Sequence, residues 1–118
     1  MDPINPLAID VTTEGTSATV VVRGEIDLAT QAEFRAVLSD LVVSGQVNLT
    51  IDLSGVEFID STGLGALIGA RRRVHAFNGS LCLREPSDPV MKVFTVTGLN
   101  RVFDIQEADV EEKSSAAS

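Results

Sequence analysis

Cysteine and histidine are scarce in this sequence. Its 118 residues include one cysteine, Cys82, and one histidine, His75. A single cysteine excludes an intramolecular disulfide, and no pair of cysteines or histidines exists at the spacing of metal ligands. Cys82 lies in the alternating segment Ser80–Arg84, where we expect a small buried hydrophobic side chain. The sequence therefore predicts neither a disulfide nor a metal site.

Motifs of several enzyme classes are also missing. No G-x-x-x-x-G-K-[ST] loop is present to hold nucleotide phosphates. The nucleophile pattern G-x-S-x-G fails at Ser61, because Ile59 stands where the first glycine is needed. His75 follows Ser61 by 14 residues on one expected helix, about 21 Å away, so it is no catalytic base for Ser61. We expect His75 at the surface and no catalytic residue in this chain.

Positive charge and long apolar runs are in short supply. The chain has nine basic and 17 acidic residues, which gives a formal net charge of −8. This charge argues against nucleic-acid binding. The one basic run, Arg71–Arg73, points in three directions around a helix and suits a solvated helix end. No apolar run approaches the ~20 residues of a membrane span, and the start of the chain lacks the features of a signal peptide. We therefore expect a cytoplasmic protein with no membrane segment.

What the sequence does contain is typical of one globular domain. Hydrophobic residues make up 44% and charged residues 22% of the chain, and its length suits a single modest core. From Glu107 the chain turns acidic and then rich in serine and alanine. We predict a domain over residues 1–106 and a tail over 107–118 that is frayed or partly helical.

The hydrophobic pattern predicts strands that alternate with helices. Expected strands are Leu7–Val11, Ser17–Arg23, Val47–Leu53, Ser80–Arg84 and Val102–Ile105, and expected helices begin after Thr30, at about Thr62 and at about Pro89. This order, β-β-α-β-α-β-α-β with room for a further helix, predicts an α/β fold. Its sheet of four to five strands is mostly parallel, the first strand is antiparallel, and three to four helices leave part of one face thinly covered.

Some local patterns carry more specific expectations. Thr30 and Glu33 fit a capping box, and Gly24–Asp27 reads as a loop. The β-branched run Thr19–Val22 suggests a central strand buried on both faces. We expect Asn78-Gly79 to cap the second helix and Gly98 to stop the third.

The second helix, expected over Thr62–Phe77, presents two different faces. Its core stripe is predicted to be Leu64, Leu67, Ile68, Ala70, Val74 and Phe77. A second face holds Ser61, Gly65, Gly69 and Arg72. Glycine inside a helix costs up to ~1 kcal/mol relative to alanine, so this face has a reason to be small. Two explanations stay open: close approach by another backbone, or tight packing against the chain's own sheet.

The start of this helix is the strongest candidate site. Ser61 and Thr62 can each cap a helix, and a hydroxyl there lies beside unpaired backbone N–H groups and the positive end of the helix dipole, where a phosphate is favoured. We predict Ser61 as a phosphoacceptor, with phosphate donated by a second protein. Asp27 and Asp60 are expected at the same sheet edge. They either orient the hydroxyl and bind cationic groups of a partner, or serve as a loop hydrogen bond and a helix-start charge.

Several motifs together resemble those of the STAS-domain anti-sigma factor antagonists. They are Gly-Glu-Ile-Asp at 24–27, the run Ile51–Gly65 with Asp-Ser-Thr-Gly-Leu at 60–64, Asn78–Ser80, Val93-Phe94 and Thr97–Leu99. The resemblance spans about residues 7–106. Family resemblance thus implies the STAS fold and a bacterial partner-switching module.

The resemblance also implies partners. In that family the unphosphorylated antagonist binds an anti-sigma factor, which is also a serine kinase, and so frees a sigma factor. The kinase phosphorylates the serine after the motif Asp, here Ser61, and a metal-dependent serine phosphatase reverses this. Asp27 matches a position implicated in the kinase contact. ATP and magnesium belong to the kinase, so no cofactor or small-molecule substrate is expected here.

We expect partner contacts at the residues of the two motifs and of the small helix face. They are Asp27, Asp60, Ser61, Thr62, Gly63, Gly65 and Gly69. Thr62 ranks below Ser61 as a phosphate site. Two other functions remain: a STAS subunit of a transporter or a scaffold in a larger signalling assembly, and a Ser61-dependent hydrolase, which the missing base disfavours.

Overall fold

The computed structural model describes residues 7–107 as one five-stranded sheet with its helices. The elements are β1 Leu7–Glu14, β2 Ser17–Ile26, α1 Gln31–Val43, β3 Asn48–Ile59, α2 Ser61–Ala76, β4 Ser80–Arg84, α3 Asp88–Thr97, the 3₁₀ turn η1 Leu99–Arg101 and β5 Asp104–Gln106. The strands lie in chain order, β1-β2-β3-β4-β5. β1 is antiparallel to β2, and every other pair is parallel. The predicted α/β fold is confirmed.

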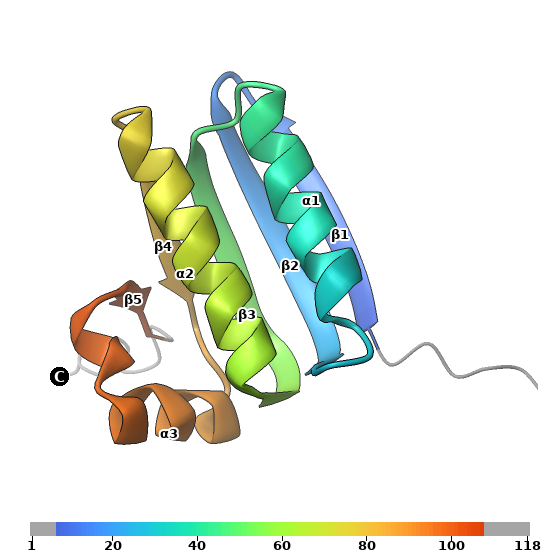
Figure 1. Ribbon diagram of the computed structural model, residues 1–118, viewed down its shortest axis with the longest axis vertical. Coiled ribbons are helices and arrows are strands. Elements are labelled where there is room, and N and C mark those ends of the chain that lie inside the picture. Colours follow the sequence, from blue (N-terminus) through green and yellow to red (C-terminus); the bar gives the residue numbers. More distant parts are fainter. Residues whose placement is uncertain (1–6, 108–118) are drawn as a thin grey trace, which may run out of the picture.

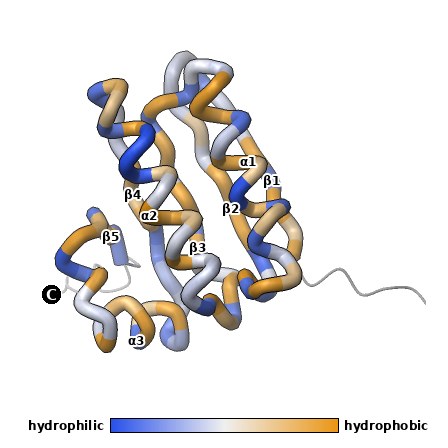
Figure 2. Tube along the Cα trace, in the orientation of Figure 1, coloured by the Kyte–Doolittle hydropathy of each residue, from blue (hydrophilic) through white to orange (hydrophobic). Residues whose placement is uncertain are grey.

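The helices cover the sheet unequally. α1 and α2 lie side by side over one face, and α3 lies across the lower end of the sheet (Figure 1). Along β3, the side chains of Leu49, Ile51 and Leu53 are buried under these helices, whereas Thr50 and Asp52 on the opposite face are only half-buried. Figure 2 shows the matching hydrophobic stretches in the strands behind α1 and α2. The core is therefore one-sided, as the small number of helices predicted.

The opposite face of the sheet is polar and carries two ion pairs. Arg84 contacts Asp52 at 3.1 Å, and Arg23 contacts Asp10 at 2.8 Å. Burial raises the pKa of Asp52, but hydrogen bonds from Ser54 and Arg84 outweigh it, so this pKa lies below its usual range. Cys82 lies half-buried on this face instead of in the core, and burial raises the pKa of its thiol.

Four strand predictions were wrong in extent, and one of them was also wrong in burial. The first strand continues past Val11 to Glu14, and the last lies at Asp104–Gln106 instead of Val102–Ile105. β2 continues through Gly24–Ile26, which we expected as a loop, and β3 continues six residues past Leu53 to Ile59. The two extensions pair with each other through register shifts, so the strict alternation that marks a strand in sequence is lost there. β2 is also not buried on both faces, because Thr19 and Val21 are half-buried on the uncovered side.

The helix ends match the sequence better than the helix caps do. Asn78 has a positive φ of 61° after α2, and Gly98 has a φ of 79° after α3, as expected of helix-ending residues. Thr30 is the N-cap of α1, but no capping box forms, because its hydroxyl accepts instead from the Asp27 N–H at 3.0 Å and donates to the Glu25 carbonyl at 2.8 Å. Phe77 does not belong to the core stripe, because 63% of it is exposed.

α3 is fixed to the far end of β3. Its buried residues Val90 and Phe94 face inward, and the Phe94 ring lies 5.9 Å from that of Phe103. The Ser87 hydroxyl donates to the Val56 carbonyl at 2.5 Å. None of the helices in residues 7–107 has the length and hydropathy that crossing a bilayer demands.

Candidate functional site

The candidate site lies where two neighbouring parallel strands end. Ile26 of β2 pairs with Ile59 of β3, and the Asp60 N–H donates to the Ile26 carbonyl at 3.1 Å. Asp27 and Asp60 follow these paired residues directly. The expectation that Asp27 and the Asp60-Ser61 pair share one edge of the sheet is therefore confirmed, and α2 starts from that edge (Figure 1).

Asp60, and neither Ser61 nor Thr62, is the N-cap of α2. Its carboxylate accepts hydrogen bonds from the N–H groups of Thr62 at 2.9 Å and Gly63 at 3.2 Å. The Thr62 hydroxyl donates to the same oxygen at 2.5 Å. The hydrogen bond from that hydroxyl is the main cause that holds the pKa of Asp60 below its usual range. Desolvation acts in the opposite direction and raises the pKa, whereas the N–H groups of Gly63, Thr62 and Leu28 lower it further.

Ser61 is left free by this arrangement. It is the first residue of α2, its side chain is exposed, and its hydroxyl makes no hydrogen bond within residues 7–107. Thr62, by contrast, is half-buried and its hydroxyl is engaged by Asp60. Of these two adjacent hydroxyls, only that of Ser61 stands open to a second protein.

The N-cap changes the expected surroundings of a phosphate on Ser61. The N–H groups of Thr62 and Gly63, which we expected to be unpaired, already bind Asp60. A phosphate on Ser61 therefore adds negative charge next to an existing carboxylate instead of filling an empty anion site. The dipole of α2 still favours the phosphate. Because Ser61 is exposed, the charge of the phosphate would face solvent or a partner.

Asp27 organises the loop that precedes α1. Its carboxylate accepts from the N–H groups of Ala29 at 3.0 Å and Thr30 at 3.1 Å. This is the loop hydrogen bond that the sequence left open as one of two roles. The same loop exposes the large apolar side chain of Leu28, with 74% of its surface accessible. Leu28 was not predicted as a site residue, and nothing in its spacing marked it.

The three glycines of α2 fall into two classes. A Cβ on Gly63 would lie 2.6 Å from Ile26 Cγ2 and 2.7 Å from Ile59 Cγ1, so packing within the chain explains this glycine. A Cβ on Gly65 or Gly69 would meet nothing within 4 Å. Tight packing against the chain's own sheet is thus excluded as the reason for Gly65 and Gly69. A contact of any of the three with a partner stays a prediction.

The surroundings offer no metal-binding cluster in the part of the chain that the structure describes. No group of three or more His, Cys, Asp or Glu side chains in residues 7–107 is arranged to hold a metal ion. His75 is exposed in the last turn of α2, at the opposite end of that helix from Ser61. The basic segment Arg71–Arg73 lies near the same end, where Figure 2 shows a strongly hydrophilic stretch.

An exposed aromatic residue lies just before the site. Phe58 is 49% exposed and belongs to β3, three residues before Ser61. It forms one wall of an open groove whose other wall is α3. Strand alternation from Val56 would have placed Phe58 inside, so sequence reasoning missed it; Ile59 is buried instead, beyond the register shift of β2 and β3.

Comparison with known proteins gives consistent matches. A family model described as "Mlab, STAS domain" matches residues 9–107. The chain is 34% identical over 92 residues to the anti-sigma-B factor antagonist of Listeria monocytogenes, covering 78% of this chain and 81% of that protein.

Two solved structures of one protein have the same fold. The anti-sigma factor antagonist SpoIIAA in its unphosphorylated form matches with 29% identity and a TM-score of 0.72, covering 93% of this chain and 96% of that one. The Bacillus cell fate determinant SpoIIAA in the phosphorylated form matches with 24% identity and a TM-score of 0.70, covering 94% of this chain and all (100%) of that one.

Proposed function

Because this chain belongs to the STAS domain family, we propose that it is an anti-sigma factor antagonist that phosphorylation of Ser61 switches off. The unphosphorylated chain binds an anti-sigma factor that is also a serine kinase, and this frees a sigma factor. The observation that carries the proposal is the exposed hydroxyl of Ser61 at the first position of α2, which makes no hydrogen bond within residues 7–107.

The phosphoryl transfer needs only the hydroxyl from this chain. The γ-phosphoryl group of ATP, held by the kinase, passes to Ser61 Oγ: the bond to the β-phosphate oxygen breaks, an O–P bond forms, ADP leaves, and the hydroxyl proton goes to a base of the kinase. A serine phosphatase reverses this with water and releases inorganic phosphate. Both partners act in the cytoplasm in this scheme.

The switch works through charge. Phosphate adds about 1.5 to 2 negative charges at pH 7. Two unit charges 4 Å apart repel by about 1 kcal/mol in water and about 4 kcal/mol at an effective dielectric of 20. Since each 1.4 kcal/mol is tenfold in affinity, an acidic partner surface would bind the phosphorylated form from about fivefold to several hundredfold more weakly. Asp60 adds to this charge from the neighbouring position.

The other proposed contacts surround Ser61. Asp60, Thr62 and Gly63 hold the start of α2 in place, and Asp27 holds the loop beside it. Gly65 and Gly69 leave the outer face of α2 low enough for a partner's backbone to approach. All of these residues belong to the proposed domain over 1–106.

Binding and phosphate mapping test the proposal together. The chain is mixed with candidate serine-kinase anti-sigma factors of its own organism and ATP; mass spectrometry locates the phosphate, and calorimetry gives Kd before and after. We expect phosphate on Ser61 only, with Ser61→Ala bound and unmodified. Ser61→Glu should bind at least about fivefold more weakly. Wild-type affinity for Ser61→Glu would disprove the charge switch.

A further inference from the structure

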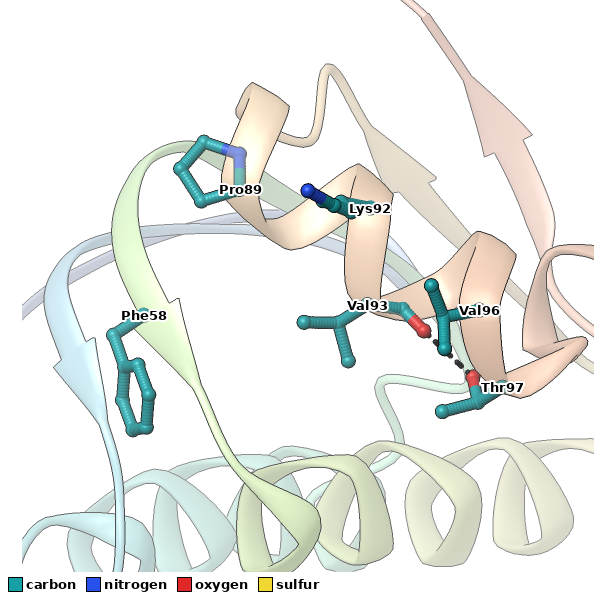
Figure 3. Close-up of a pocket in the computed structure, with 6 residues that line it drawn as sticks. All are labelled: Phe58, Pro89, Lys92, Val93, Val96 and Thr97. Carbon is teal, nitrogen blue, oxygen red and sulfur yellow. Dashed lines mark hydrogen bonds between the residues drawn. The ribbon is translucent and has the colours of Figure 1, made fainter.

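The described residues form an open apolar groove between β3 and α3. Its volume is about 450 Å³, and its lining residues are Phe58, Pro89, Lys92, Val93, Val96 and Thr97. Figure 3 shows Val93 extending from α3 toward the strand that carries Phe58. Both walls of the groove are accessible, since Val96 of α3 is 77% exposed and Phe58 of β3 is 49% exposed. Such a groove has the size and apolar lining of a site for one or two large side chains.

This groove lies within reach of any protein that docks on Ser61. Phe58 precedes Ser61 by three positions in the chain, so their Cα atoms are no more than about 11 Å apart. A standard interface covers about 800 Å² on each partner, which as a disc has a radius of about 16 Å. A partner of this size centred on Ser61 therefore has the reach to contact Phe58. Leu28 is a second exposed apolar residue near Ser61, because its N–H contributes to lowering the pKa of the adjacent Asp60 and 74% of it is exposed.

The charge at the rim indicates what accompanies the apolar contact. Lys92 lines the groove and has no carboxylate within ion-pair distance among residues 7–107. The ammonium group is thus available to a carboxylate of a partner. An acidic partner surface is also what the proposed phosphate switch requires, because only such a surface is repelled by phosphoserine.

We propose that the groove between β3 and α3 receives a large apolar side chain, flanked by a carboxylate, of the same anti-sigma factor that docks on Ser61. This inference rests on the proposed function and adds a second contact to it. Phe58 and Leu28 are the apolar anchors, and Lys92 pairs with the carboxylate. Ser61 then controls an interface whose affinity comes largely from the groove.

Matched substitutions separate the groove from the rest of the surface. Phe58→Ala is compared with Phe77→Ala, because both phenylalanines are exposed but Phe77 lies about 24 Å along α2 from Ser61. Val96→Asp is compared with Val43→Asp, two exposed helix valines, of which Val43 lies at the end of α1 away from the site (Figure 1). Circular dichroism confirms that each variant is folded, and calorimetry measures Kd for the unphosphorylated chain.

We expect Phe58→Ala and Val96→Asp to weaken binding by about tenfold or more, and Phe77→Ala and Val43→Asp to stay within about twofold of wild type. Lys92→Glu should also weaken binding. If the wild-type chain binds the kinase and the folded variants Phe58→Ala and Val96→Asp bind it with the same Kd, this inference is wrong and the proposed function still stands. If wild type binds none of the kinases, both fail. If the chain sediments as a dimer that Val96→Asp dissociates, a second copy occupies the groove and the inference is wrong.

Discussion

At the residue scale, the start of α2 assigns different tasks to three adjacent polar side chains. Asp60 caps the helix, Thr62 donates to Asp60, and Ser61 between them is exposed with a hydroxyl that makes no hydrogen bond to any described residue. The same contacts that stabilise the helix start keep Ser61 out of the hydrogen-bond network. A chemical change on Ser61 therefore leaves the cap intact, which suits a switch that alters binding without unfolding the domain.

The lowered pKa of Asp60 predicts how stability depends on pH. A carboxyl whose pKa is lower in the folded state stabilises the protein above its unfolded pKa of about 3.9, and this contribution is lost as pH falls through the folded value. We expect Asp60→Asn to be less stable than wild type in urea unfolding at pH 7. The difference should shrink as pH drops below about 4. A difference that is the same at pH 7 and pH 3 would show that the charge of Asp60 is not responsible.

Thr62 offers a separate check on the same contact. Because the Thr62 hydroxyl is the main cause of the lowered pKa, Thr62→Val should raise the pKa of Asp60 toward its usual range. Carbon NMR titration of the Asp60 carboxyl measures this directly. Thr95→Val serves as the control, because it removes a hydroxyl that donates to the Met91 carbonyl and is not among the groups that shift the pKa of Asp60.

Sequence reasoning reached these residues but not their roles. The Asp-Ser-Thr-Gly-Leu pattern located the helix start within one residue, yet Ser, Thr and Asp are all good N-caps, so residue type did not decide among them. Only the backbone shows that Asp60 is still extended and Ser61 already helical. Leu28 and Phe58 were missed because their exposure depends on a loop and a register shift, which leave no periodic signal.

At the element scale, α2 combines a tightly packed inner glycine with two open outer ones. Its inner face packs through Gly63, Ala66, Leu67, Ala70 and Val74. Its outer face has no side chain at Gly65 and Gly69. The periodicity of 3.6 residues predicted most of this inner face correctly. It failed at Phe77, because the helix ends there and the chain turns away.

Alanine substitutions at the inner and outer glycines of α2 should change the stability of the fold in opposite directions. Gly65→Ala and Gly69→Ala each remove the entropic cost of a helical glycine without a clash, so each should stabilise the fold by about 0.4–1 kcal/mol. Gly63→Ala should destabilise it by about 1–3 kcal/mol, because Ile26 and Ile59 must move. Urea unfolding measures all three. A loss of stability in Gly65→Ala would mean that the outer face is not open.

At the scale of the whole molecule, the fold is a sheet with one buried and one accessible side. Helices α1 and α2 bury one side, while threonines, ion pairs and Cys82 occupy the other. The order of elements in the sequence was enough to predict a mostly parallel sheet and the antiparallel first strand. The small number of helices also predicted a thinly covered part of one face, but not which face the helices cover, since that depends on how long each connection is and how the sheet twists.

Neighbouring residues of β3 test this one-sidedness. Ile51 is fully buried under the helices, and Thr50 lies on the other side. We expect Ile51→Ala to lower the free energy of unfolding by about 2–5 kcal/mol, and Thr50→Ala by at most about 1 kcal/mol. Equal losses at the two positions would contradict a single core beneath α1 and α2.

The agreement between strand order and chain order has a consequence for how the protein is made. Each newly synthesised strand pairs with the strand that was synthesised just before it, which is then the edge strand of the sheet. No strand has to insert between two strands that have already paired. Synthesis and assembly can thus proceed in the same direction. By the time Ala76 has emerged, the nascent chain already contains every segment needed to present Ser61.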